Sequence, residues 1–464
     1  MGTDPTNRQP PPAQSQPSVP AGPRWEFPIR WDIVEEHLDE AGFHHRQWER
    51  ALDDPDYTLE EVAEGPEERM LANIDGLVVH GRRVAEKTLL PALAGDDLDL
   101  VFPAAYALLA SEDGDFTDPV IAVLESDEPE RVAEVVRALE LVPREDIASR
   151  MLPLVAEGTP LVKAAALRVL GFRRIDPGVR LDALLASDEP ELRKAALWAA
   201  RFFRHRLDPR QLEFALRGEE VEERNIAIET GLILGDKTAW AVCQEVVRGG
   251  EAEGWDRPAL LYALSGEADI QPLIAALGDE ARRKGALFAL GFTGRVEAVD
   301  AVVPWLGDEE CGRLAGEAFS GITGLVIEKK FAKAAKGWKP GVVEEEEEEH
   351  TAESDLPEPE PKAVSEWWLG SKKRLDSARK SVQGKSFNLE EVSSAFAVCS
   401  TRKRTALALE LAVRARGFQQ LEMRAWTHQQ EAQTRSMCRP DAGPHRTGSV
   451  ASSRGEGKTG ARLS

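Results

Sequence analysis

The sequence predicts an all-α protein: an α-solenoid of about eight helix pairs, with an N-terminal helical cap and a small C-terminal helical module. One sequence pattern recurs between residues 85 and 325. It consists of an apolar helix, a short acidic or glycine turn and an alanine-rich helix. The last apolar residue before each turn recurs every 29 to 31 residues, as expected of a repeat architecture. These residues are Leu93, Leu124, Val155, Leu185, Leu216, Val247, Leu277 and Leu306.

The pattern within one repeat predicts two helices that must pack on their neighbours. Leu192, Ala195, Ala196 and Ala199 stand at positions i, i+3, i+4 and i+7, which form one face of a helix. The prolines in the turns, such as Pro190, suit the first turn of a helix. Helices of about eleven residues cannot bury their apolar faces in pairs, so successive pairs are expected to stack.

The chain divides into six predicted segments. The leader holds seven prolines in its first 23 residues, and its composition predicts disorder. The linker is centred on six consecutive glutamates, Glu344–Glu349, whose mutual repulsion favours an extended chain. The predicted segments are a disordered leader (1–24), the cap (25–84), the solenoid (85–327), an acidic linker (328–361), the C-terminal helical module (362–430) and a disordered tail (431–464).

The charge distribution restricts the classes of partner. The 464 residues include 58 Lys and Arg against 81 Asp and Glu, a net charge of −23. Residues 341–361 carry a net charge of −10 and residues 362–464 carry +10, so the whole surplus belongs to residues 1–340. Because nucleic-acid binding needs a basic surface, we expect a protein partner with a basic or neutral segment. Nucleic acid is disfavoured, and no small-molecule substrate is identified.

The cysteines and the hydropathy indicate the compartment and exclude some chemistry. Cys243, Cys311, Cys399 and Cys438 lie far apart without paired spacing, which fits a reducing compartment. No stretch reaches the length of about 18 apolar residues that a membrane span needs. We therefore expect a cytoplasmic protein that has no membrane partner. No motif indicates a catalytic residue, a cofactor or a metal, and the first three cysteines are expected in the helix core.

Two groups of residues are candidates for partner binding. Trp367 and Trp368 are adjacent, and adjacent residues on one helix are not expected to face the same core, so we expect an exposed aromatic pair of the kind that anchors interfaces. Glu36, His37 and Glu40 lie on a predicted helix of the cap. Because the i, i+4 histidine spacing of a zinc helix is absent there, these three residues are expected on an amphipathic surface rather than at a metal.

The module also carries two basic clusters, Lys372–Arg374 and Arg402–Arg404. Two interpretations are open. The clusters balance the acidic linker within the molecule, or they bind an acidic partner with a strength that falls as salt rises.

The repeat length and the alanine-rich second helix resemble the short bacterial HEAT-like repeats, a type also found in phycobilin lyases. The flanking segments resemble an uncharacterised proteobacterial family of HEAT-repeat proteins that is frequent in myxobacteria. The similar segments within residues 29–430 are Ile33–His37, Glu40-Ala41, Arg46–Trp48, Pro55–Leu59, Ile74–Leu77, Leu314–Phe319, Ile322–Gly324, Trp367-Trp368, Ala406–Glu410, Leu421-Glu422 and Arg424–Trp426. Some members of the family are found near type VI secretion genes, so the resemblance implies an accessory role in a bacterial secretion system.

The expected function is a non-enzymatic protein–protein interaction scaffold, because stacked helix pairs form a concave surface that commonly binds proteins. The alternative is an enzyme on HEAT-like repeats, either bilin lyase-like or DNA glycosylase-like.

Overall fold

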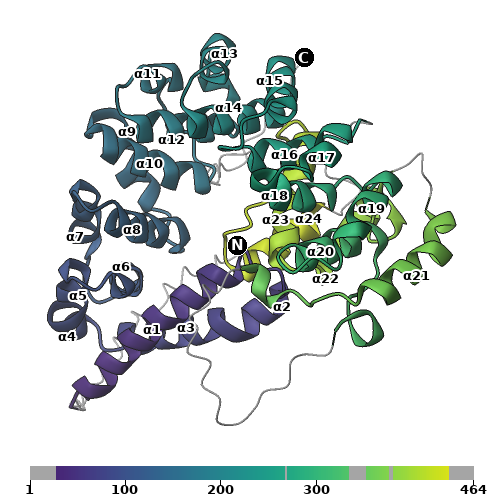
Figure 1. Cartoon of the computed structure of the whole chain (residues 1–464). Helices are drawn as coiled ribbons and strands as arrows, with labels where there is room; N and C mark the ends of the chain where they lie inside the picture. The colour runs from purple at the N-terminus through teal and green to yellow at the C-terminus, as the bar shows by residue number, and fades with distance from the viewer. Residues whose placement is uncertain (1–27, 267–268, 334–351, 376–379, 438–464) are drawn as a thin grey trace, which may run out of the picture.

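The computed structural model describes residues 28–266, 269–333, 352–375 and 380–437 (Figure 1). The predicted leader, the six glutamates and the last part of the predicted tail lie outside these residues. No helix within the described ranges has the length and apolarity that crossing a membrane requires.

The N-terminal cap consists of two long helices and a short irregular turn between them. Helix α1 (Trp31–Ala51) packs along α3 (Glu68–Val78). The helix α2 (Leu59–Val62) begins at a capping box in which Thr58 and Glu61 bind each other's backbone N–H groups. It leads into the π-helical turn η1 (Ala63–Glu67). This turn brings Glu67 into the core of the cap, where its side chain is buried.

The described residues contain eight helix pairs, as predicted, and the fold is an all-α solenoid (Figure 1). The first helices are α5 (Leu90–Ala94), α7 (Thr117–Ala122), α9 (Ile147–Glu157), α11 (Leu181–Leu185), α13 (Pro209–Leu216), α15 (Lys237–Arg248), α17 (Gln271–Ala276) and α19 (Val296–Val302). The second helices are α6 (Val101–Ala110), α8 (Pro129–Leu141), α10 (Pro160–Phe172), α12 (Pro190–Ala200), α14 (Val221–Leu234), α16 (Asp256–Leu264), α18 (Glu280–Leu290) and α20 (Gly312–Thr323). Short helical turns precede or join them, namely α4 (Arg82–Val84), η2 (Ala85–Leu89), η3 (Leu98–Leu100), η4 (Val123–Glu125), η5 (Arg204–Arg206) and η6 (Val303–Trp305).

The repeat register read from the sequence corresponds to the buried core. The sequence pattern places one apolar residue at the end of the first helix of each of the eight pairs. Seven of these eight residues are buried, and the eighth, Leu185, is half-buried beside the buried Leu184. Pro129 and Pro190 occupy the first helical turn, as expected. Each second helix contacts the second helix of the next pair. The second helices therefore form one continuous inner layer.

The C-terminal part packs back onto both the array and the cap. Helix α21 (Pro361–Ser371) lies beside the end of the array, and a small antiparallel hairpin, β1 (Ser381–Val382) with β2 (Lys385–Ser386), follows it. Helix α23 (Thr401–Arg414) contacts α14 and α16, and α24 (Thr427–Met437) contacts α2 and η1. The remaining elements are η7 (Lys329–Phe331), η8 (Ala352–Asp355), η9 (Lys372–Arg374) and α22 (Leu389–Val398).

Figure 1 shows the consequence for the shape: the array curves around, and α23 and α24 fill the space between its far end and the cap. Two predicted boundaries need correction. Helix α24 continues to Met437, whose side chain is buried, so the disordered tail does not begin at residue 431. Both ends of the predicted linker are ordered, since Ala332 pairs with Pro359 in a β-bridge and Lys333 forms an ion pair with Glu358.

Candidate binding cavity on the concave face

A cavity of about 830 Å³ lies on the concave face of the array. Its floor comes from the second helices α8, α10, α12 and α14, and its opposite side comes from α23 and residues 420–424. Residues 401–437, called the C-terminal segment below, therefore cover part of the concave surface and narrow it to a partly open cavity.

The cavity lining repeats with the period of the array. Arg137, Arg168, Trp198 and Glu229 stand at the same position of four successive second helices, 31, 30 and 31 residues apart, and all four line the cavity. Ala133, Ala164 and Ala195 form a second row with the same period. The stacking of equivalent helices thus brings side chains that are distant in the sequence into adjacent rows.

Arginine and aromatic side chains stack along one wall of the cavity. The guanidinium of Arg168 lies 4.6 Å from the centre of the Trp198 ring, and that of Arg201 lies 5.1 Å from it. Arg201 and Arg174 both lie over Phe202, at 4.7 and 3.7 Å. Such cation–π contacts are favourable where water is partly excluded. A side chain at Gly171 would collide with the Trp198 ring, so glycine permits the ring to lie there.

Most charged side chains of the cavity are paired with a neighbour. Glu229 accepts hydrogen bonds from Arg201 at 2.8 Å and Arg257 at 2.7 Å. Burial alone would raise the pKa of Glu229, but Arg257 and Arg201 together hold that pKa below its ordinary value. Arg174 forms an ion pair with Glu422 at 3.3 Å, and burial lowers the pKa of Arg174 to about 10.

Arg168 differs from these residues because it makes no ion pair with any described residue. Its side chain is exposed to the cavity, and its guanidinium lies over the Trp198 ring. A cation held by an aromatic ring leaves its N–H donors free to bind an incoming carbonyl or carboxylate.

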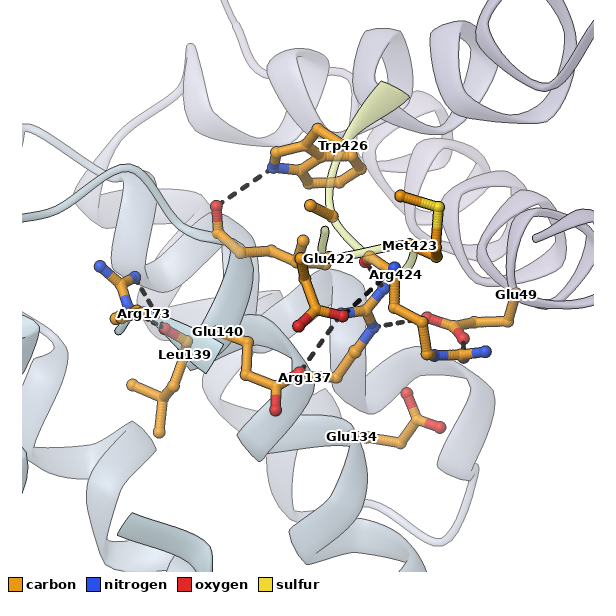
Figure 2. A network of polar contacts seen from close by, with 12 residues as sticks. Glu49, Glu134, Arg137, Leu139, Glu140, Arg173, Glu422, Met423, Arg424 and Trp426 are labelled. Carbon is orange, nitrogen blue, oxygen red and sulfur yellow. Dashed lines mark hydrogen bonds and ion pairs between the residues drawn. The ribbon is translucent and has the colours of Figure 1, made fainter. Parts of the chain in front are cut away.

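The C-terminal segment is fixed to the wall of the cavity by a buried network (Figure 2). Arg137 donates to Glu49 at 2.6 Å, to Glu140 at 3.2 Å and to the backbone carbonyl of Arg424. Burial lowers the pKa of Arg137 and raises that of Glu140. Figure 2 also shows the indole of Trp426, which donates to the carbonyl of Leu141 at 3.1 Å. One arginine of the array thus binds both the cap and the segment.

A second buried group joins the cap to α24. Glu67 accepts hydrogen bonds from the indole of Trp48 at 2.8 Å and from the hydroxyl of Thr427 at 2.6 Å. The rings of Trp48 and Trp426 lie 4.9 Å apart, and Tyr106 of α6 meets Trp426 edge-on at 5.7 Å. The aromatic rings of the cap, the first repeat and the C-terminal segment therefore share one core.

Trp367 and Trp368 are not the exposed pair that the sequence predicts, and that expectation is wrong. Trp368 is only 3% exposed, and its indole donates to Asp300 at 3.0 Å. Trp367 is half-buried, and both rings meet Phe319 of α20 at about 6 Å. Two adjacent residues can share one core here because the Phe319 ring lies within reach of both. Leu369 is the exposed residue, at 79%.

The three cap residues are near one another, as expected for one helical surface. Glu36 and Glu40 are exposed, and the Nδ1 atom of the half-buried His37 lies 2.8 Å from the side-chain oxygen of Asn73. The Glu40 carboxylate lies 3.5 Å from Nε2 of the buried His44. These residues lie on α1 and do not line the concave cavity. Their role as a partner-binding surface stays a prediction.

The cysteines behave as core residues, as predicted. Cys243, Cys311 and Cys399 are free and buried, and burial raises the pKa of Cys243 to about 12 and that of Cys399 to about 11. A buried thiol with a raised pKa is a poor nucleophile. No group of three or more metal-ligating side chains forms among the residues described.

The basic clusters are partly neutralised within the chain. Lys372 forms an ion pair with Asp300 at 2.6 Å, and Arg402 forms one with Glu353, at the edge of the predicted acidic linker, at 3.3 Å. The contact of Arg402 with Glu353 favours the first interpretation of the clusters, whereas Lys372 pairs with α19 of the array. The cavity residues Arg137, Arg168 and Glu229 were not among the predicted site residues, although the 31-residue period marks them as one row.

Comparisons with known proteins add little. No family profile and no curated protein matches this sequence. Solved structures that match include an engineered protein, at 19% identity and a TM-score of 0.30 over 62% of this chain and 87% of that one. Human deoxyhypusine hydroxylase in complex with glycerol matches at 17% identity and a TM-score of 0.23, over 62% of this chain and 96% of that one. At these low TM-scores, neither likeness carries an inference about this chain.

Proposed function

We infer that the protein is a non-enzymatic scaffold that holds a segment of a partner protein in the concave cavity. The observation that carries this proposal is the row of Arg137, Arg168, Trp198 and Glu229, which four successive repeats present to one cavity. The volume of about 830 Å³ is typical of ligand-binding cavities.

The chemistry of the cavity supports a peptide as its occupant. The alanine row leaves room beside the helices, and Trp198 and Phe172 offer apolar surface. Acidic and basic side chains alternate around this surface in nearly equal number. An extended peptide needs both features, because its backbone requires hydrogen-bonding groups and its side chains require apolar contact. We propose that it meets its partner in the cytoplasm, where its free cysteines would stay reduced.

Photo-crosslinking tests the proposal. A photoreactive phenylalanine analogue replaces Leu161, which is 48% exposed and lines the cavity, and in a matched control it replaces Phe214, which is 80% exposed on α13 and does not line it. We expect one partner peptide to crosslink from position 161 and not from position 214. The variant Arg168→Glu should weaken binding of that peptide at least tenfold, while Arg217→Glu, at the C-cap of α13, should not. Equal crosslinking from both positions would contradict the proposal.

The resemblance of the flanking segments supports a partner from a bacterial secretion system. We propose an accessory role there, which a survey of neighbouring genes tests directly. Adjacent type VI secretion genes are expected. Attachment of a bilin, or excision of a DNA base, by the purified protein would overturn the non-enzymatic assignment.

A further inference from the structure

Helix α23 also borders a second, smaller pocket on its other side. This pocket lies between α18, α20, the hairpin and α23, and its volume is about 30 Å³. Its apolar walls include Phe288, Phe292 and Leu407. The two phenylalanines are half-buried, so the pocket reaches the surface.

A buried carboxylate without a partner lines this pocket. Glu317 of α20 is 7% exposed, and neither of its carboxylate oxygens has a hydrogen-bond partner among the described residues. Buried charges in proteins are normally paired, because an isolated charge loses its hydration without compensation. We therefore expect a cation to bind beside the carboxylate of Glu317.

A second carboxylate contributes one more free oxygen. Lys380 and Arg414 both donate to Oε1 of Glu410, at 2.6 and 2.8 Å. Its Oε2 is buried without a hydrogen-bond partner among the described residues, and Glu410 lines the same pocket. Three oxygens of Glu317 and Glu410 thus lack a hydrogen-bond partner among the described residues of this pocket. Of the two aromatic rings, that of Phe288 already has the Arg402 guanidinium 4.3 Å from its centre.

We propose that this pocket binds the ammonium group of a lysine side chain from the partner protein. An ammonium has three N–H donors, which matches the three free oxygens, and aromatic rings favour a cation beside them. The small volume favours a compact ammonium over the larger planar guanidinium. The assignment of this lysine to the partner protein rests on the proposed function. The affinity of the pocket for an ammonium group is independent of the proposed function.

Lys403 is the competing occupant within the chain. It lines the pocket, is half-buried and makes no ion pair with any described residue. If Lys403 turned onto Glu317, it would neutralise the carboxylate and leave no site for an external amine. The experiment must therefore separate these two arrangements.

Titration of the full-length protein with Nα-acetyl-lysine-N-methylamide, followed by calorimetry, tests the proposal without any partner. We expect saturable binding that Glu317→Gln weakens at least tenfold, that the exposed control Glu309→Gln leaves unchanged, and that Lys403→Met leaves equal or tighter. The arginine and norleucine analogues should bind at least tenfold more weakly. The thermal midpoint of the wild type should rise with the lysine compound, whereas that of Glu317→Gln should not.

Three outcomes would overturn the proposal. Binding that is absent, or equal in Glu317→Gln, means that the pocket holds water only. Binding to Lys403→Met but not to the wild type means that Lys403 already neutralises Glu317. Spermidine that binds more than tenfold tighter than the lysine compound makes a free polyamine the ligand. None of these results changes the crosslinking result at position 161, so the two proposals can fail separately.

Discussion

Thr427 donates both its backbone N–H and its hydroxyl to the buried carboxylate of Glu67, which lies 360 residues earlier in the chain. This contact joins the last described helix to the N-terminal cap. Together with the Trp48–Trp426 ring contact, it closes the array into a loop around the cavity. The concave surface is therefore shaped by residues from both ends of the described chain.

Loss of the Thr427 hydroxyl should loosen this closure. Thr427→Val keeps the shape of the side chain but leaves the Glu67 carboxylate without one donor, at a cost of about 1–3 kcal/mol. We expect faster amide exchange in α24 and in η1, measured by hydrogen–deuterium exchange. Thr238→Val, on the half-buried face of α15, is the matched control and should leave both segments unchanged.

The pH dependence of stability should reveal the burial of Glu67. Burial raises the pKa of Glu67 above its ordinary value of 4.5, although the hydrogen bonds from Thr427 and Trp48 offset part of this increase. A raised pKa means that the folded state holds the proton more tightly than the unfolded state. The free energy of unfolding relative to Glu67→Gln should therefore fall as the pH rises from 4.5 through the raised pKa. Denaturant titrations across this range check the sign, and a rising difference would contradict it.

The contribution of Glu229 to stability should depend on pH with the opposite sign to that of Glu67. Arg257 and Arg201 outweigh the effect of burial and lower the pKa of Glu229. Its stabilisation is thus complete above the ordinary carboxyl pKa of 4.5 and is lost as the pH falls through the lowered value. Glu229→Gln should cost about 1–3 kcal/mol at neutral pH and less in acid. A cost that stays constant with pH would show that the two ion pairs do not form.

Removal of the Trp426 ring should release the C-terminal segment selectively. Trp426→Ala leaves a cavity between the cap and α6 and should cost about 3–5 kcal/mol. Trp255 is fully buried within the array, so Trp255→Ala is a control of similar size. Limited proteolysis should cleave residues 415–437 early in the first variant. If both variants are cleaved equally there, Trp426 does not hold the segment.

The array could be predicted from the sequence because its cause is local and repeated. Leu124, Val155 and Leu216 recur with one period, and each is buried for the same reason. Arg168 and Glu229 follow the same period, but charged positions carry no hydrophobic signal. The apolar pattern that sets the repeat register therefore does not mark the cavity row.

The contact between the N-terminal cap and the C-terminal segment could not be predicted in the same way. Glu67 lies in a π-helical turn beside Pro66, and no periodic relation connects it to Thr427. The predicted exposure of Trp367 and Trp368 was wrong for a similar reason, because it considered one helix without the Phe319 ring that packs against both. Contacts between distant segments depend on how the array curves, which the repeat pattern does not specify.

An engineered disulfide between the cap and α23 tests the central claim most directly. Thr58 and Ser400 face each other in an antiparallel β-bridge, where the distance between Cα atoms suits a disulfide. We expect Thr58→Cys/Ser400→Cys, made with Cys399→Ala, to form the disulfide under mild oxidation, as mass spectrometry of the digested protein would show. Thr58→Cys/Ser365→Cys in the same background should not form it. If the first pair stays reduced while the protein is folded, the C-terminal segment does not close the array onto the cap.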